Sequence, residues 1–368
     1  MVWFTFFVQF AIVAVCVCIH ATDTADTCTV TLPAVNSSVF DTAAAINTQI
    51  EKWMARGLNA ATICLTSGDY YFNGIVTVPA NFSFHIIGGR AQSSQFITTI
   101  GSTYFLLNFS ESMSLSSIIF SNYLNGAVTG NTVSFEADNV FWAGFQYGAI
   151  NIDATNFVFR NSGVRGNSAM EGPGAITVNG LKFGYITNSV FEDNTAAAGD
   201  PGGCCAGVSL SGVGEVIIDS SIFSGNSAPA GGGGLITTGL AVTITNSSFL
   251  ENSVGWNIVV WGGAISLTGG SLNIVSSNFS QNSASCGGPA IAASAYSSFV
   301  IVNSTFEDNN SIQDCLDIMP VNGTILYHGV VPTLFDVTFS GNWGYTGHNY
   351  TAKLPLQDIS NFEPAPLK

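Results

Sequence analysis

Apolar and polar residues alternate in short runs along the second half of the chain, and each run ends in a phenylalanine. The clearest runs are EVIIDSSIF, AVTITNSSF, SLNIVSSNF and SFVIVNSTF. Glycine-rich stretches that lead into another short apolar run stand before them: GGCCAGVSL, GGGGLITT, GGAISL and GGPAIAA. Alternation with a period of two predicts β-strands, and these cycles show no helical periodicity. We therefore expect an all-β protein built from repeated cycles of two or three strands.

The motif Phe-x-x-Asn closes each cycle. It begins at residues 191, 223, 249, 279, 306 and 339, so its spacings are 32, 26, 30, 27 and 33 residues, and a looser version lies at 157–169. Cycles this short do not hold the four antiparallel strands of a propeller blade, and leucine is not the repeated residue, as a leucine-rich array requires. The remaining architecture is a single-stranded parallel β-helix, with Phe-x-x-Asn coils over about 157–345 that stack about 4.8 Å apart.

The repeated residues have structural roles in such a coil. The phenylalanines should point inward as a stacked aromatic ladder. Each asparagine should occupy a turn, where Asn tolerates the left-handed conformation and bonds to its own backbone or to the Asn of the next coil. The paired glycines should allow a positive φ before the next strand. The predicted ladder comprises Phe191, Asn194, Phe223, Asn226, Phe249, Asn252, Phe279, Asn282, Phe306, Asn309, Phe339 and Asn342.

A helix is predicted ahead of the coils, at about 41–56. Asp41 or Thr42 is a suitable N-cap, apolar residues follow at helical spacing, and Gly57 stands just past the end. The apolar residues are Ala45, Ile46, Ile50, Trp53 and Met54. Because the first coil of a solenoid exposes an apolar end, we expect this helix to cap it.

The order DTAAAINTQIEKW, then ICLTSGDYYFNGIVTVPANFSFHIIGG, resembles the capped entry to right-handed parallel β-helices of the pectin lyase-like superfamily. The Gly-Gly-Ala-Ile and Phe-x-x-Asn cycles resemble the repeats of chlamydial polymorphic outer-membrane proteins, which are surface adhesins. The first resemblance implies a right-handed coil, and the second implies adhesion at a surface. Such repeats specify a fold well and a function poorly.

The first 21 residues, MVWFTFFVQFAIVAVCVCIHA, predict a secretory signal peptide. An uncleaved membrane anchor is the alternative, because no Lys or Arg precedes Lys52. We expect the signal peptide at 1–21, the β-helix domain at 22–350 and a C-terminal tail at 351–368. The mature chain is expected to lack a membrane span and to be secreted or held at the cell surface.

Cysteines and glycosylation motifs agree with export. An even number of cysteines follows the signal peptide, and Cys286 and Cys315 come four and six residues after successive ladder asparagines, which predicts a disulfide between adjacent coils. The pairing of Cys28, Cys64, Cys204 and Cys205 stays open. Nine Asn-x-Ser/Thr motifs predict glycosylation in a eukaryotic host, at Asn36, Asn81, Asn108, Asn246, Asn278, Asn303, Asn309, Asn322 and Asn349.

Charge excludes several partners. The chain has 23 acidic and 8 basic residues, a formal net charge of −15, so nucleic acid and anionic lipid are not expected to bind it. The four histidines are scattered and no Cys-x-x-Cys occurs, so we predict no metal site and no cofactor, with calcium as the exception if the protein is a lyase.

The chain offers weak candidates for catalysis. The hydrolase signatures of the pectinase branch are absent. Basic residues within about one coil of each other, together with nearby acidic residues, would be needed for lyase chemistry. The candidates are Arg160, Arg165, Lys182 and Asp193, with Glu171 and Glu192 near in sequence. The alternative is that they are solvated turn residues. The acidic pairs at 192–193 and 307–308 should lie roughly 15–20 Å apart, too far to act together.

These observations favour a secreted β-helix with an adhesive, glycan-binding or extracellular structural role, whose partner is an extracellular polysaccharide or a glycoprotein surface. Stacked Ser, Thr and Asn on the sheet faces would bond to sugar hydroxyls, and exposed aromatic rings would stack on sugars. The candidate rings are those of Trp142, Tyr147, Trp256, Trp261 and Trp343. The alternative function is a polysaccharide lyase or glycoside hydrolase of the pectin lyase-like superfamily.

Overall fold

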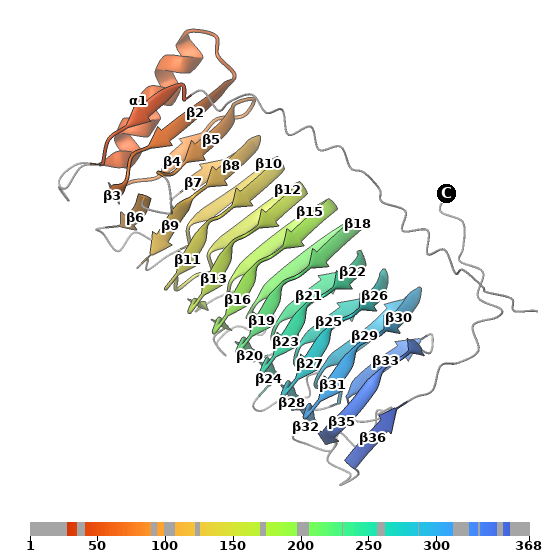
Figure 1. The fold of residues 1–368 in the computed structure, drawn as a ribbon. Coiled ribbons are helices and arrows are strands. Elements are labelled where there is room, and N and C mark those ends of the chain that lie inside the picture. The colour runs from red at the N-terminus through yellow and green to blue at the C-terminus, as the bar shows by residue number, and fades with distance from the viewer. Residues whose placement is uncertain are drawn as a thin grey trace, which may run out of the picture.

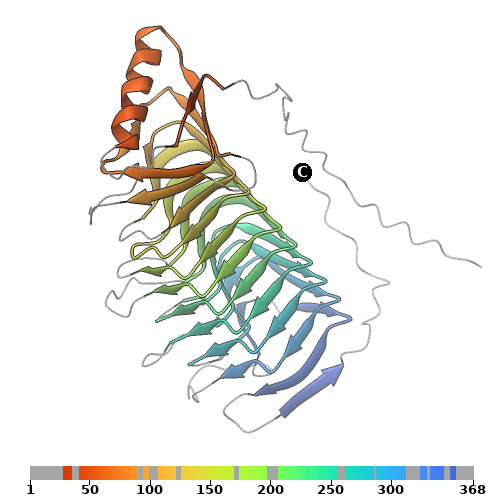
Figure 2. The same ribbon diagram turned by 60° about the vertical axis from the view of Figure 1, so that its left-hand side comes forward.

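The computed structural model describes residues 28–34, 41–89, 94–98, 107–121, 126–169, 174–196, 206–229, 231–255, 262–285, 287–311, 324–329, 332–343 and 349–353. These residues form a solenoid of strands, parallel except for β36, that advances along one axis from α1 to β36 (Figures 1 and 2). The predicted signal peptide, the Cys286–Cys315 pair, Cys204 and Cys205, and the glycosylation motifs at Asn36 and Asn322 lie outside the described residues.

Two stacked sheets make up the walls of the solenoid. The strands of the first, sheet A, are β1 (Val30–Leu32), β2 (Ala60–Leu65), β4 (Val76–Val78), β5 (Ser83–Ile87), β7 (Leu107–Phe109), β8 (Ser112–Ser116), β10 (Val128–Asp138), β12 (Ile150–Arg160), β15 (Ile176–Thr187), β18 (Val208–Asp219), β21 (Leu235–Thr238), β22 (Ala241–Thr245), β25 (Ile265–Thr268), β26 (Ser271–Val275), β29 (Ile291–Tyr296), β30 (Ser298–Val302), β33 (Ile325–Gly329) and β34 (Thr333–Phe335).

The strands of the second, sheet B, are β3 (Gly68–Phe72), β6 (Ser94–Thr98), β9 (Ile118–Ser121), β11 (Phe141–Ala143), β13 (Gly163–Arg165), β14 (Ser168–Ala169), β16 (Val190–Glu192), β17 (Thr195–Ala196), β19 (Ile222–Ser224), β20 (Ser227–Ala228), β23 (Ser248–Leu250), β24 (Ser253–Val254), β27 (Asn278–Ser280), β28 (Ser283–Ala284), β31 (Thr305–Glu307), β32 (Asn310–Ser311), β35 (Thr338–Trp343) and β36 (Asn349–Lys353).

The described end of the chain closes the last coil. β36 pairs antiparallel with β35, whereas β35 pairs parallel with β31 of the preceding coil. Residues 351–353 therefore belong to the last strand, so the fold extends past the boundary predicted at 350.

The cap at the N-terminal end agrees with the prediction. Helix α1 (Thr42–Ala55) packs against β3 and β4 across the end of the coils (Figure 1). Asp41 is the N-cap, because its carboxylate accepts the backbone N–H of Ala43 at 3.0 Å. Ile46, Ile50 and Trp53 face the coils and are buried, whereas Met54, expected on the same face, is 43% exposed.

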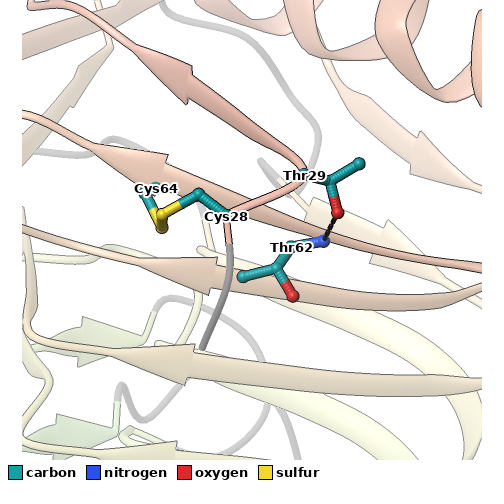
Figure 3. Close-up of a disulfide and its surroundings, with 4 residues drawn as sticks. All are labelled: Cys28, Thr29, Thr62 and Cys64. Carbon is teal, nitrogen blue, oxygen red and sulfur yellow. Dashed lines mark hydrogen bonds between the residues drawn. A yellow bond between two sulfur atoms is a disulfide. The ribbon is translucent and has the colours of Figure 1, made fainter. Parts of the chain in front are cut away.

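A disulfide joins the first strand to the first complete coil. Cys28 is bonded to Cys64, which places β1 alongside β2 (Figure 3). Thr29 accepts the backbone N–H of Thr62 at 2.9 Å beside it. The structure thus answers, for these two cysteines, the question of pairing that the sequence left open.

The phenylalanine ladder is present as predicted. The six Phe residues pair in register from coil to coil, and their ring centroids are 4.7, 4.7, 5.0, 4.7 and 5.1 Å apart. None of the six is more than 5% exposed. The stack continues toward the N-terminus through Phe159, Trp142 and Phe120. These rings form the interior of the solenoid over most of its length.

The asparagines form a second ladder, inside the coil. Each predicted Asn is fully buried. In the middle coils the Nδ2 group donates to Oδ1 of the next Asn and to the carbonyl oxygen of the Phe one coil back, as Asn252 does to Asn282 (3.0 Å) and to the carbonyl of Phe223 (2.8 Å). The bond to the next Asn was one of the two alternatives predicted, and it satisfies buried polar groups that would otherwise cost free energy.

The left-handed conformation was assigned to the wrong residue. The residue with positive φ is the one before each ladder Asn, and its φ lies between 51° and 63° in all six coils: Asp193 (54°), Gly225 (62°), Glu251 (55°), Gln281 (56°), Asp308 (51°) and Gly341 (63°). This turn directs the following Asn inward, where its amide finds the neighbouring coils. The preceding residue stays at the surface and can be acidic, glycine or glutamine.

Asn309 is a special case, because it was predicted both as a ladder residue and as a glycosylation site. Its Nδ2 group donates to the carbonyl of Phe279 and to Oδ1 of Asn342, both at 2.9 Å, and the side chain is fully buried. A glycan on Nδ2 would replace one of these hydrogens and would need space that the core does not have. The packing around Asn309 in the folded chain therefore does not suit a glycan, and glycosylation there stays a prediction.

A serine ladder, which the sequence analysis missed, runs beside the phenylalanines. Each Ser donates from Oγ to the carbonyl two residues earlier, as Ser247 does to Thr245 at 2.7 Å. The same Oγ accepts the backbone N–H of the equivalent residue one coil back. For Ser247 this residue is Ser221, at 3.1 Å, and for Ser162 it is Val140, at 3.0 Å. The ladder comprises Ser162, Ser189, Ser221, Ser247, Ser277 and Ser304. From Ser189 onward, its signal in the sequence is a serine two positions before the ladder phenylalanine, whereas Ser162 stands two positions before Val164.

The two glycines of a pair have different structural roles. Gly262 has a φ of 82°, as predicted for a turn. Gly263 does not, and a Cβ atom there would lie 2.3 Å from the carbonyl oxygen of Pro289 and 2.4 Å from that of Ser283. The second glycine therefore allows adjacent coils to approach, which the sequence analysis did not anticipate.

Candidate functional site

The outward side of the longest strands of sheet A carries a cluster of large apolar side chains. On β15, Phe183 and Tyr185 point outward because Gly184 between them faces the interior, where a Cβ atom would lie 2.9 Å from Cγ2 of the buried Val216. Tyr185 is in register with Val158 on β12 and with Ile217 on β18. We call these four residues, Val158, Phe183, Tyr185 and Ile217, the aromatic face; all four are half-buried.

An ion-pair cluster borders the aromatic face on its N-terminal side. Arg160, at the end of β12, donates from Nη2 to Oε1 of Glu136 at 2.5 Å and from Nε to Oδ2 of Asp138 at 3.0 Å. Glu136 is in register with Val158, so the cluster continues the same column of outward side chains. The three side chains are about one-third exposed, at 36%, 36% and 34%. Arg160 is thus held by two carboxylates.

Asp219 borders the face on the other side. Its Oδ1 accepts hydrogen bonds from the hydroxyl of Thr245 and from Nδ2 of Asn246 (3.0 Å), and its Oδ2 accepts one from the hydroxyl of Ser220 (3.0 Å). Burial raises the pKa of this carboxyl, but the hydrogen bonds from Thr245, Asn246 and Ser220 together outweigh burial and lower the pKa below its usual value. Asp219 is therefore a fixed carboxylate at neutral pH.

A polar column follows the earlier part of the same strands. The exposed Asn179 donates to Oδ1 of Asp153 at 3.0 Å and accepts the hydroxyl of Ser211 at 2.9 Å. The column continues in register along later coils through Thr238 and Thr268. Stacked Asn, Ser and Thr were expected on the sheet faces, and here they offer a row of hydrogen-bonding groups toward solvent.

The structure disperses the predicted catalytic residues. Arg160 is in register with Thr187 on β15. The exposed Lys182 lies on the same strand five residues before Thr187, a distance of about 16 Å along the strand. Arg165 lies on sheet B, where it forms an ion pair with Glu192. Asp193 lies at the exposed turn beside Gly225. Only Arg165 and Glu192 are brought together, and Glu171 lies outside the described residues.

The acidic pairs are separated as expected. Glu192 and Glu307 occupy the same register position four coil steps apart, which is about 19 Å. Within the described ranges, no group of three or more His, Cys, Asp or Glu side chains could hold a metal ion. Among the described helices, none is long and apolar enough to cross a membrane.

The aromatic residues proposed for sugar stacking need correction. Trp142 is 1% exposed and lies in the core between Phe120 and Phe159. Tyr147 is 40% exposed. Trp256 and Trp261 lie outside the described residues, as does the side chain of Trp343. Phe183 and Tyr185 were missed, although the run LKFGYIT has the alternation that points both rings to one face, with glycine as the inward residue.

The topology and register define this protein as a right-handed single-stranded parallel β-helix. Residues 202–354 match a protein-family model described as "Right handed beta helix region". No curated protein matches the chain. The resemblance to chlamydial repeats stays a prediction.

Several solved structures are similar to the chain. The A-module of the Azotobacter vinelandii mannuronan C-5 epimerase AlgE4 matches with 13% identity over 84% of this chain and 98% of that chain, at a TM-score of 0.43. The PL6 family polysaccharide lyase Pedsa3628 from Pseudopedobacter saltans matches with 10% identity over 91% and 90%, at 0.36. PfbA, a surface adhesin of Streptococcus pneumoniae, matches with 10% identity over 86% and 94%, at 0.34.

Proposed function

We propose that this protein is exported and binds an extracellular polysaccharide on the aromatic face without cleaving it. The observation that carries the proposal is the pair Phe183 and Tyr185, two rings that face solvent from one strand of a sheet held by neighbouring coils on both sides. Because the backbone beneath them is already ordered, a sugar that stacks on the rings pays little conformational entropy of the protein.

Polar groups at the borders of the face suit the hydroxyls of a sugar. The carboxylates of Glu136 and Asp138 lie on one side and that of Asp219 on the other, and Glu215 is in register with Phe183. An aromatic platform with a few polar groups at its edge is the usual composition of a small-ligand site. The polar column through Asn179 would extend such contacts along the solenoid.

The charge of this surface favours an uncharged ligand. Two basic residues, Arg160 and the exposed Lys182, stand against four carboxylates that border the face, so the border is net negative, and the whole chain carries −15. The four are Glu136, Asp138, Glu215 and Asp219. A polyuronate or sulfated chain would be repelled. We therefore propose a neutral polysaccharide, free or on a glycoprotein surface, as the partner.

The placement of the basic residues supports binding rather than cleavage. Lyase chemistry needs a base and a charge-neutralising group on the same sugar. Arg160 is held by the carboxylates of Glu136 and Asp138, and Arg165 forms an ion pair on the other sheet. Lys182 lies about 16 Å along β15 from the residue that is in register with Arg160. No observation on the described residues favours the lyase or hydrolase alternative.

The test is equilibrium binding of the purified chain to neutral and acidic polysaccharides. We expect binding to a neutral member, weakened about tenfold or more by Tyr185→Ala and by Phe183→Ala, which corresponds to about 1.4 kcal/mol or more. Phe141→Ala is the matched control, because Phe141 is an exposed ring (39%) on sheet B. Equal binding by all three variants and the wild type would refute the proposed face.

The same mixtures, with calcium added, are assayed for new reducing ends and unsaturated uronates. We expect no product. Product release that is abolished by Arg160→Ala or Lys182→Ala would replace the proposal with a polysaccharide lyase or glycoside hydrolase.

A further inference from the structure

The positions of the glycosylation motifs divide the solenoid into three parts. No Asn-x-Ser/Thr tripeptide begins between residues 109 and 245, although asparagine is frequent there. This interval runs from β8 to β22 and contains the whole aromatic face. Five coil steps separate Asn108 on β7 from Ile236 on β21, which is about 24 Å along the axis.

One corner of the coil shows the contrast most directly. Asn188, Asn246 and Asn303 occupy the same turn between sheets A and B in different coils, with φ values of 48°, 49° and 47°, and all three are exposed. Each is followed by a serine of the buried ladder. Asn246 and Asn303 have Ser248 and Thr305 two residues on, which completes the motif, whereas Asn188 has Val190.

The ladder asparagines are protected by a different device. The residue two positions after the ladder Asn faces the interior, and in four coils it is a small apolar residue buried in one cluster: Ala196, Ala228, Val254 and Ala284. In these four coils no Ser or Thr therefore stands two positions after the buried Asn, so the Asn-x-Ser/Thr motif is incomplete. Asn309, with Ser311, is the exception, and its amide hydrogens are both bonded within the core.

Five other motifs have side chains that the structure describes, and all five are accessible. Asn81, Asn108, Asn246 and Asn303 are exposed, and Asn278 is half-buried on the outward side of β27. Asn246 and Asn303 donate one amide hydrogen, to Asp219 and Ser276, at 3.0 and 3.1 Å. A glycan needs only the other hydrogen, so these contacts are compatible with modification.

We propose that the chain carries N-glycans on its first and last coils and that the interval 109–245 stays bare, so that a polysaccharide can reach the aromatic face. The modified residues are Asn81, Asn108, Asn246, Asn278 and Asn303, and Asn309 is left unmodified. The inference rests on the export in the proposed function. It deepens the proposed function, because it says which part of the surface a polysaccharide can reach and where glycans limit that part.

The first experiment is glycopeptide mass spectrometry on the full chain, secreted from eukaryotic cells with its own N-terminus. We expect N-glycans at the five accessible positions and none at Asn309. Occupied Asn309 in folded, secreted protein, or empty Asn246 and Asn303, would overturn the inference. Retention of the unglycosylated chain in the cytosol would overturn both the inference and the export on which it rests.

The second experiment places a glycan inside the bare interval. Val190→Thr completes the motif at Asn188 with a nearly isosteric side chain, and Asn188 lies three residues from Tyr185. We expect one added N-glycan and at least a tenfold loss of polysaccharide binding. The same variant from the periplasm of a bacterium that does not N-glycosylate should bind as the wild type does, and so should Asn303→Gln from eukaryotic cells.

The outcomes separate the two proposals. Full binding by the glycosylated Val190→Thr variant, when Tyr185→Ala has lost binding, would overturn the role of the bare interval but leave the proposed function standing. A wild-type chain with the expected occupancy that binds no polysaccharide would refute the proposed function, while the glycosylation pattern would stand.

Discussion

Asn252 donates from Nδ2 to Oδ1 of Asn282, 3.0 Å away on the next coil, and both side chains are fully buried. Oδ1 of Asn252 in turn accepts from the backbone N–H and from Nδ2 of Asn226, at 3.2 and 2.9 Å. The amide therefore ties three successive coils together. An Asn that only occupied a turn could be replaced at little cost in stability. Asn252 cannot, because its amide is the hydrogen-bond partner of several buried polar groups.

Asn252→Ala should consequently destabilise the protein by about 3 kcal/mol, because buried donors and acceptors on two neighbouring coils lose their partner. The free energy of unfolding, from urea denaturation followed by circular dichroism, measures this loss. Asn273→Ala, at an exposed position of β26 on the next coil, should cost about 0.5 kcal/mol. Similar losses for the two variants would contradict the ladder's role.

The phenylalanine stack predicts a loss of similar size. Phe249 lies between Phe223 and Phe279, with centroid distances of 4.7 and 5.0 Å, and is fully buried. Phe249→Ala should cost about 3–5 kcal/mol through lost transfer free energy and the cavity that remains. Phe249→Leu should cost clearly less, and Ile222→Ala, on the outward side of the same sheet, should cost less than about 1 kcal/mol. Thermal denaturation of the three variants would check this order.

Asp219 should make the stability of the fold depend on pH. Its pKa is lower in the folded chain than the ordinary value of 3.8, so its hydrogen bonds stabilise the fold above that value. This contribution is lost as the pH falls below 3.8 and through the folded-state pKa. The urea midpoint should therefore fall less between pH 6 and pH 3 in Asp219→Asn than in the wild type.

Glu215→Gln is the control for Asp219→Asn, because it removes the same charge from the same strand. We expect its loss of stability with falling pH to stay closer to that of the wild type. If the two variants lose stability equally between pH 6 and pH 3, the hydrogen bonds from Thr245, Asn246 and Ser220 do not act as described.

The disulfide between Cys28 and Cys64 should hold the N-terminal strand on the first coil. The cysteines are 36 residues apart, and closing a loop of that length restricts the unfolded chain by about 4 kcal/mol in the chain-entropy account. The double variant Cys28→Ser/Cys64→Ser should lower the thermal midpoint and speed hydrogen exchange in β1. If reductant changes the thermal midpoint of the double variant further, that change comes from the other cysteines. Hydrogen exchange in β1 that is as slow in the double variant as in the wild type would refute the prediction.

Much of the coil was readable in the sequence. Alternation with a period of two predicts strands without knowledge of the fold, and a motif that returns every 26 to 33 residues brings Phe191 and Phe223 to equivalent places in successive coils. The helix at α1 was predictable for the same reason, since a cap, apolar spacing and a final glycine are local signals.

Other features depended on register and on the path of the chain between coils. Trp142 and Tyr185 are both aromatic residues in alternating strands, yet one is in the core and the other faces solvent, because alternation separates two sets of residues without saying which set faces inward. The partners of Arg160, on a strand 22 residues earlier, likewise follow from parallel register rather than from nearness in sequence.

The sequence by itself determined the repeat and the inward phenylalanines, and it offered the bond from each ladder Asn to the next as one of two alternatives, because these depend on local pattern and on stacking of identical positions. Only the tertiary structure decided which residue takes the left-handed turn, which rings remain at the surface and that Asn309 is sealed in the core. Those outcomes depend on the spacing and packing of whole coils, since a side chain's burial is set by its neighbours on adjacent strands and not by its own type.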